Sequence, residues 1–203
     1  MTTMFYLGVH HPHWLQTAGV PLFVSHRRLA GRRSLPRAAA RWALDSGDYT
    51  ELALHSRWTI TAGGYAAAIR RYRDEIGLLD WAAPMDWMCT PPVLAATGLT
   101  VAQHQRRTVT GFLRLLDLGP DLDVIPMVQG LDPDDFLRHA ESYQRAGVDL
   151  TRFPLVGVGS VAVRQHTHVA ARIVTGLATE TGLRLHGFGV KLWLPFPSVQ
   201  CPR

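Results

Sequence analysis

The alternation of short apolar segments with helical segments constrains the fold of this 203-residue chain most strongly. From Ala43 onward, apolar runs of strand length alternate with stretches in which apolar residues recur at helical spacing. Such alternation is typical of parallel βα units. The segment 124–128 is apolar on both faces, as a parallel strand covered by helices would be. The order predicts a parallel α/β fold.

Seven strands are expected, over residues 4–9, 20–25, 41–44, 79–83, 124–128, 155–158 and 183–190. Helices are expected over 64–76, 100–118, 132–146 and 165–181. In the helix that Thr100 begins, Val101, Val109, Phe112, Leu113 and Leu116 should form the buried stripe. His104, Arg106 and Arg107 should then lie largely on its exposed face. A closed barrel of this class has eight strands and about 250 residues, so this chain falls short of one.

Composition limits the class of protein. The chain is 47% hydrophobic and 18% charged, as expected of a globular protein. It has no signal peptide and no long apolar run, so we expect a cytoplasmic protein that does not enter a membrane. Its two cysteines, Cys89 and Cys201, cannot build a disulfide framework or a cysteine-rich zinc site. No metal and no other cofactor is expected.

Positive charge is concentrated near the N-terminus. The net charge is +5, and Arg27, Arg28, Arg32 and Arg33 follow the second expected strand closely. This segment could contact a nucleic-acid backbone, or it could be a solvated basic loop. Upstream, three histidines lie between residues 10 and 13, but a loop interrupted by proline lacks the spacing of a metal site. A loop that faces nucleic acid, with Trp14 available for stacking, fits better.

Polar residues follow several expected strands directly. Asp45-Ser46-Gly47 follows one strand, and Asp86 follows the next. Asp45-Ser46-Gly47 alone could be a turn, yet a carboxylate at the carboxyl end of a parallel strand is well placed for chemistry. Gln129-Gly130 and Gly157-x-Gly159 follow two later strands. The latter spacing is not that of a dinucleotide fingerprint, and small residues there allow a ligand to approach the backbone.

Taken together, these strand ends resemble the queuine and archaeosine tRNA-guanine transglycosylases and, more closely, their relatives that place deazapurines in DNA. The segments that carry the resemblance are 44–49, 84–89, 126–130, 156–161 and 185–190. They occur in the family's order and span nearly the whole chain. The N-terminal segments 5–8, 11–14 and 21–29 resemble the DNA-acting branch rather than the tRNA-acting one.

The resemblance implies a barrel of the TIM (β/α)8 type, truncated at its C-terminal end to about seven strands. It would fill residues 1–191, and residues 192–203 would form an irregular proline-rich tail. The implied reaction exchanges guanine in DNA for a free 7-deazaguanine base of the preQ0 type. The implied partners are DNA rather than tRNA, the free base and other DNA-modification proteins.

The resemblance also assigns roles to individual residues. Asp45 would serve in acid/base steps, and Asp86 and Gln129 would hydrogen-bond the guanine edge. Ser46, Gly47, Gly157 and Gly159 would complete the base site. Asp48 stands where the family has a glycine.

Two departures bear on activity. The family nucleophile is a later aspartate, and this sequence has no acidic residue after Glu180. The chain could therefore be inactive, or act only as a module that binds DNA or a partner. The zinc site of the tRNA enzymes is absent. A queuine-type tRNA enzyme and an unrelated barrel hydrolase with Asp45 and Asp86 as paired carboxylates are the remaining alternatives.

Overall fold

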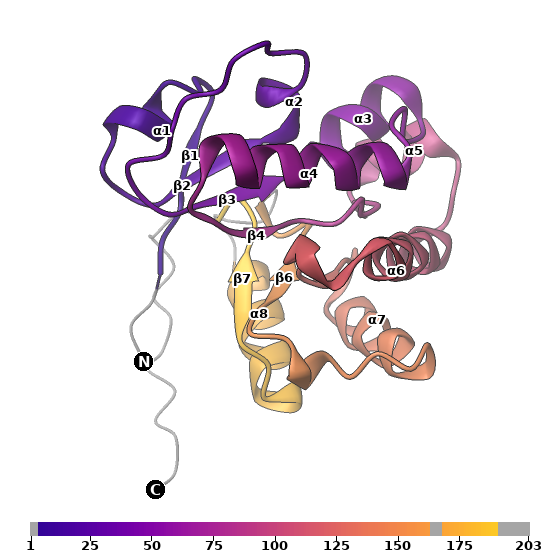
Figure 1. Cartoon of the computed structure of the whole chain (residues 1–203). Coiled ribbons are helices and arrows are strands. Elements are labelled where there is room, and N and C mark those ends of the chain that lie inside the picture. Colours follow the sequence, from indigo (N-terminus) through magenta and orange to yellow (C-terminus); the bar gives the residue numbers. More distant parts are fainter. Residues whose placement is uncertain (1–3, 163–167, 191–203) are drawn as a thin grey trace, which may run out of the picture.

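The computed structural model describes residues 4–162 and 168–190, which form two parallel sheets covered by helices (Figure 1). The first sheet has the order β1-β2-β3-β4, and the second has the order β5-β6-β7. The strands of the first sheet are β1 (Leu7–Val9), β2 (Leu22–Ser25), β3 (Trp42–Asp45) and β4 (Leu79–Ala82). The strands of the second sheet are β5 (Met127–Val128), β6 (Val156–Val158) and β7 (Leu185–Gly187). All pairs are parallel, and a parallel bridge between Ala82 and Val124 connects the two sheets. The predicted parallel α/β fold is confirmed.

Within residues 4–162 and 168–190, eight α-helices accompany the strands. They are α1 (Trp14–Thr17), α2 (His26–Leu29), α3 (Asp48–His55), α4 (Ala62–Ile76), α5 (Pro91–Thr97), α6 (Val101–Leu118), α7 (Pro133–Arg145) and α8 (His168–Thr181). Two short 3-10 helices, Pro120–Leu122 and Leu150–Arg152, precede β5 and β6. The four long predicted helices are present. The short helices α1, α2, α3 and α5 were not predicted, because each has too few residues to show a periodic pattern.

Local signals explain where the long helices begin and end. The Thr100 side chain accepts a hydrogen bond from Gln103 N–H, and the Gln103 side chain bonds back to the Thr100 backbone. Asp132 and Asp135 form the same reciprocal arrangement at the start of α7, with Pro133 in the first turn. Gly77 ends α4 with a φ of 76°, a conformation that glycine adopts readily. These ends agree with the prediction.

The main core lies between the sheets and the long helices. Fully buried strand residues such as Leu44 and Val158 pack in one cluster with Ile69 of α4, Phe112 of α6 and Ile173 of α8. The opposite face of the sheets holds a smaller cluster, built on Ala43, Trp81 and Ile125 with Tyr6, Phe23, Leu155 and Phe188 against it. Both faces of the strands are therefore covered, which explains their apolar character.

One helical prediction was wrong. His104 was expected on the exposed face of α6, but it is completely buried. Its Nε2 atom lies 2.8 Å from Thr97 Oγ1, and its Nδ1 atom lies 2.9 Å from the Met88 carbonyl oxygen. Helix α5 and the loop after β4 cover this part of α6, and sequence periodicity does not show such contacts. Arg106 and Arg107 are exposed as predicted.

Candidate functional site at the strand ends

Three successive junctions after β3, β4 and β5 bring their polar residues together. Asp45 is the last residue of β3, Asp86 follows β4 by four residues, and Gln129 comes directly after β5. Ser160, which follows β6, joins them. Because the strands are parallel, their carboxyl ends meet at one edge, and side chains far apart in sequence become neighbours. Asp86, Gln129 and Ser160 are almost completely buried.

A continuous chain of hydrogen bonds connects Ser46, Asp86, Gln129 and Ser160. Gln129 Nε2 donates to Asp86 Oδ2, and Ser46 Oγ donates to Asp86 Oδ1 over 3.3 Å. On the other side, Ser160 Oγ donates to Gln129 Oε1 over 2.6 Å and accepts from the Cys89 N–H over 2.9 Å. The Ser160 hydroxyl thereby fixes which way the Gln129 carboxamide faces. The sequence grouped Ser160 with the small residues after β6 that let a ligand approach, but it gave the Ser160 side chain no role of its own.

A second group of contacts holds the Gln129 backbone. Gln105 Nε2, on α6, donates to the Gln129 carbonyl oxygen over 2.8 Å. His139 Nδ1, on α7, lies 2.7 Å from the Gln129 amide nitrogen. Burial lowers the pKa of His139 to about 4, so this ring is neutral near pH 7 and can accept that hydrogen bond. Neither Gln105 nor His139 was predicted, since both contacts depend on how α6 and α7 pack.

The site contains a third carboxyl group, that of Asp48 in the first turn of α3. Asp48 is 7% exposed, and within the described residues its Oδ2 atom has no hydrogen-bond partner. Burial and the charges of Asp86 and Asp45 raise its pKa well above the ordinary value. The resemblance gave Asp48 only as a departure from the family pattern.

The other two carboxyl groups also have raised pKa values. Burial raises the pKa of Asp86 to about 7, although hydrogen bonds from Gln129 and Ser46 oppose the change. Burial raises the pKa of Asp45 as well, and hydrogen bonds from Ser25 and the Gly47 backbone lower it in part. Neighbouring carboxyl groups that are buried away from water cannot all stay ionised, because their negative charges repel one another. Near neutral pH the cluster retains protons, so it can both donate and accept hydrogen bonds.

The turn at Gly47 places Asp45 and Asp48 on either side of a sharp bend. Gly47 has a φ of 84°, and a Cβ atom there would lie 2.9 Å from Arg27 Cγ. Arg27 in turn forms a 3.0 Å ion pair with Glu51 on α3. A side chain at position 47 would be strained and would displace Arg27. The Asp45-Ser46-Gly47 segment is thus a tight turn that also carries polar groups into the cluster.

Gly157 and Gly159 were predicted to let a ligand approach the backbone. A Cβ atom at Gly157 would overlap Met127, and one at Gly159 would overlap the Gln129 side chain. Both glycines therefore make room for protein side chains. For Gly159 the effect on the site is direct, because the space is the one in which the Gln129 carboxamide lies.

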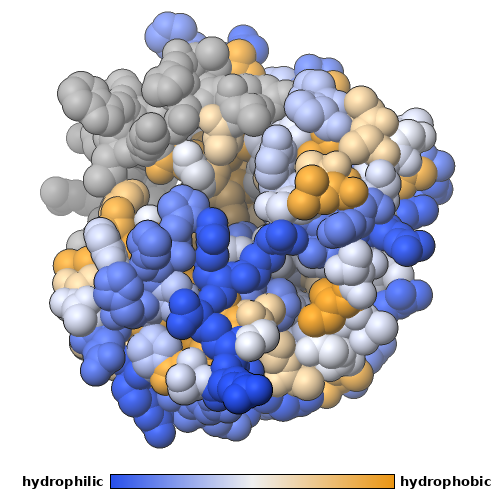
Figure 2. Space-filling view, turned by 90° about the horizontal axis from the view of Figure 1, so that it is seen from above, coloured by the Kyte–Doolittle hydropathy of each residue, from blue (hydrophilic) through white to orange (hydrophobic). Residues whose placement is uncertain are grey.

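The predicted nucleic-acid contacts follow the carboxyl end of β2, and Arg27 among them packs against the Gly47 turn. Arg27, Arg28, Arg32 and Arg33 are exposed in or just after α2, and Figure 2 shows many strongly hydrophilic residues on the face seen from above. Arg28 lies 3.4 Å from His10 Nδ1, and Arg32 donates to the Arg28 carbonyl oxygen over 3.1 Å. In residues 4–162 and 168–190, no cluster of three His, Cys, Asp or Glu residues could hold a metal ion. Cys201 lies outside the described residues.

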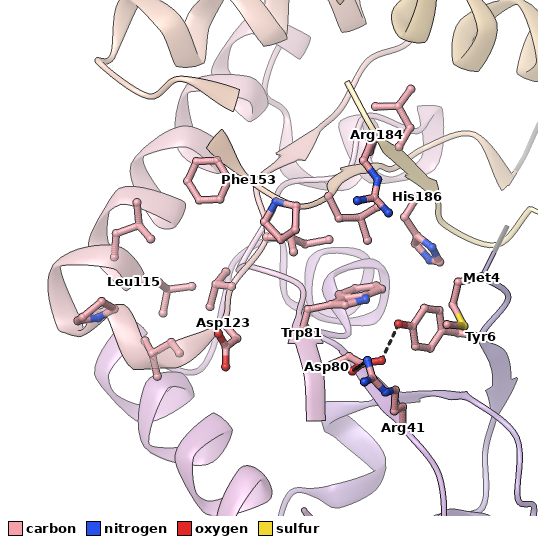
Figure 3. A pocket seen from close by; sticks show the side chains of 18 of the residues that line it. Met4, Tyr6, Arg41, Asp80, Trp81, Leu115, Asp123, Phe153, Arg184 and His186 are labelled. Carbon is pink, nitrogen blue, oxygen red and sulfur yellow. Dashed lines mark hydrogen bonds and ion pairs between the residues drawn. The ribbon is translucent and has the colours of Figure 1, made fainter. Parts of the chain in front are cut away.

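A cavity of about 720 Å³ lies at the opposite, amino-terminal ends of the strands (Figure 3). Its wall includes Tyr6, Arg41, Asp80 and Arg184, which lie before or at the start of their strands. Tyr6 Oη donates to Asp80 Oδ2 over 2.8 Å, and Arg41 pairs with Asp80 over 3.1 Å. Tyr6, Arg41 and Asp80 satisfy one another, and no residue of this wall belongs to the carboxyl cluster. We therefore place the functional site at the carboxyl ends.

Comparison with protein families identifies the chain. The family model of DpdA, described as DeoxyPurine in DNA protein A, matches residues 1–194. The chain belongs to the DpdA family. Membership supports a role in DNA modification, which agrees with the coarser part of the prediction. No curated protein matches the chain. Within the described residues, no helix is long and apolar enough to cross a membrane.

Proposed function

We propose that this DpdA family member is a nucleic-acid base transglycosylase that exchanges guanine in DNA for a 7-deazaguanine base of the preQ0 type. The observation that carries the proposal is the buried Asp86–Gln129 pair at the carboxyl ends of β4 and β5. A carboxylate can accept hydrogen bonds from the guanine N1–H and exocyclic amine together. The Gln129 carboxamide can donate and accept at the remaining edge.

The hydrogen bonds of the free protein support this assignment. Asp86 and Gln129 hydrogen-bond each other in the buried site. An entering base would replace that bond with its own donors and acceptor, so neither buried group would be left unpaired. Ser46 and Ser160 would keep the two side chains in place from either side. Ser46, Gly47, Gly157 and Gly159 thus shape the proposed base site, and Ser160 joins them.

Asp45 is the proposed acid/base residue. Burial raises its pKa above the ordinary value, which suits an acid that gives a proton to a departing purine. A retaining exchange also needs a carboxylate nucleophile on the face of the sugar opposite the base. A second candidate is a module that binds the base or DNA without exchanging it, and the exposed Arg27, Arg28, Arg32 and Arg33 support it.

We propose that the two sheets belong to one incomplete barrel of the TIM (β/α)8 type. The Ala82–Val124 bridge continues the parallel order from β4 toward β5. Rings from the first sheet also meet rings from the last strand, with Tyr6 and His186 centroids 5.8 Å apart and Phe23 and Phe188 centroids 5.2 Å apart. An experimental structure in which these rings are separated would contradict the barrel. The proposed extent of the domain is residues 1–191.

Calorimetry with guanine tests the base site. We expect binding by the wild type and loss of binding in Asp86→Ala. Asp117→Ala, which removes an exposed acid on α6, is the matched control and should bind like the wild type. Equal affinity in wild type and Asp86→Ala would refute the assignment.

Incorporation of labelled guanine into DNA, with tRNA as the comparison substrate, tests the exchange step and the nucleic acid. Incorporation into DNA alone is expected from a DNA transglycosylase. Base binding without incorporation would favour the binding module, and incorporation into tRNA would favour a queuine-type enzyme. Other DNA-modification proteins stay proposed partners.

A further inference from the structure

A second surface feature lies beside the loop that contains Asp86. A groove of about 770 Å³ lies between α6 and the segment that leads into α4, two helices that pack against each other (Figure 1). Met85 and Trp87, the two neighbours of Asp86 in sequence, line it. Trp58, which also lines it, donates from Nε1 to the Asp86 carbonyl oxygen over 3.2 Å. The groove therefore adjoins the peptide that positions the proposed base-reading carboxylate.

One face of α6 forms the polar wall of this groove. The residues on this wall are Gln103, Arg106, Arg107, Thr110, Gly111 and Arg114. Their spacing of three and four residues puts them on a single helical face. The other face of α6, with Thr108, Phe112 and Leu115, is buried in the protein. The arginines are thus held on a rigid helix and directed away from the core.

The charge of the groove is not compensated. No residue of its lining is acidic, and in the described part of the chain Arg106, Arg107 and Arg114 have no ion-pair partner. By contrast, Arg70 and Arg73 on the neighbouring helix α4 both pair with Asp121. The Arg107 guanidinium lies 4.4 Å from the centre of the Trp87 ring, which holds it in place.

We propose that this groove binds the phosphate backbone of DNA. The proposal rests on the DNA-directed function proposed above, and it adds a contact surface distinct from Arg27, Arg28, Arg32 and Arg33. Arg107 and Arg114 are seven residues apart, which corresponds to roughly 10 Å along a helix. A DNA strand carries one charge per about 3.4 Å of axis, so the arginines span several phosphates rather than a single small anion.

The first turn of α4 adds to the attraction. Ile60, Thr61 and Ala62 line the groove where this 15-residue helix begins, and the positive end of its dipole lies there. The neighbouring Gly63 has open space around the position of a Cβ atom. No side chain at position 63 therefore blocks a phosphate from this helix end. The arginines remain the main attraction.

Binding of a labelled double-stranded DNA oligonucleotide, measured over a series of salt concentrations, tests the proposal. The variant is the full chain with Arg106→Ala, Arg107→Ala and Arg114→Ala. We expect its affinity to fall about ten- to a hundredfold at low salt, and the slope of log K against log salt to decrease by about two to three. The matched control replaces Arg145, Arg152 and Arg172, which are exposed on α7, on the 3-10 helix before β6 and on α8. It removes the same charge, and we expect it to bind more tightly than the groove variant.

A further variant separates charge from packing. A variant with Arg106→Lys, Arg107→Lys and Arg114→Lys should retain most of the DNA affinity of the wild type, because lysine keeps the positive charge. Calorimetry with free guanine should give equal affinities for wild type and the alanine variant, which shows that the base site is intact. Equal DNA affinity in the alanine and control variants would refute DNA binding by the groove, and it would not affect the proposed base site. If the wild type did not bind guanine, the proposed function itself would be refuted.

Discussion

The raised pKa of Asp86 leads to a quantitative prediction for base binding. The ionised carboxylate accepts two donors from a guanine edge, so affinity should rise as Asp86 loses its proton. With a pKa of about 7, roughly one-tenth of the protein has Asp86 ionised at pH 6 and nine-tenths at pH 8. The apparent dissociation constant varies inversely with this fraction. Guanine affinity should therefore increase about tenfold between these two pH values.

Two substitutions should move the midpoint of this profile in opposite directions. Ser46→Ala removes a hydrogen bond that lowers the pKa of Asp86, so the midpoint should move to higher pH. Asp45→Asn removes a negative charge that raises this pKa, so the midpoint should move to lower pH. Calorimetric titrations with guanine from pH 5.5 to 8.5, chosen as about one and a half units either side of the midpoint, measure both.

The isosteric variant Asp86→Asn is the control for the titration. It has no proton to lose at position 86, so its guanine affinity should be weak and should not follow the profile of the wild type. A flat profile for the wild type would refute the reasoning. So would an Asp86→Asn variant that keeps the same pH dependence, because another group would then be responsible.

Other predictions concern the supports of the site and the stability of the fold. Gly159→Ala should reduce guanine affinity at least about tenfold, because a methyl group there overlaps the Gln129 side chain. Gly176→Ala, in open space on α8, is its control and should raise stability in urea unfolding by about 0.5–1 kcal/mol. Phe112→Ala should cost about 3–5 kcal/mol, since this fully buried ring packs edge-to-face on Tyr143 and Phe153; a loss below about 1 kcal/mol would contradict that packing. Thr100→Ala should cost about 1 kcal/mol by removing the cap of α6, and an unchanged melting temperature would show that the cap contributes nothing.

Much of the secondary structure could be predicted because its signals are local. Thr100 with Gln103 and Asp132 with Asp135 define helix beginnings within four residues of sequence. Gly77 ends α4 by its own backbone freedom. The strands were predicted slightly too long, and β5 is only two residues, because hydrogen-bonded length depends on neighbouring strands.

The candidate site was predictable in outline for a similar reason. In a parallel fold, polar residues after successive strands must come to the same edge, so Asp45, Asp86 and Gln129 could be grouped before their contacts were known. Their roles stay predictions. The side-chain contacts of Ser160 and His139 could not be predicted, because a serine after a strand and a histidine within a helix are common and have no distinctive local signal.

The sequence by itself determined the order of strands and helices, the helix caps and the presence of acids at the strand ends, since each depends on residues close together in the chain. Only the tertiary structure decided that Gln129 hydrogen-bonds an aspartate 43 residues away and that burial raises the pKa of Asp86 to about 7. It also buried His104 under α5 and set Arg106 and Arg107 along a groove beside α4. These properties depend on desolvation and on contacts between distant segments, and both arise only when the chain packs.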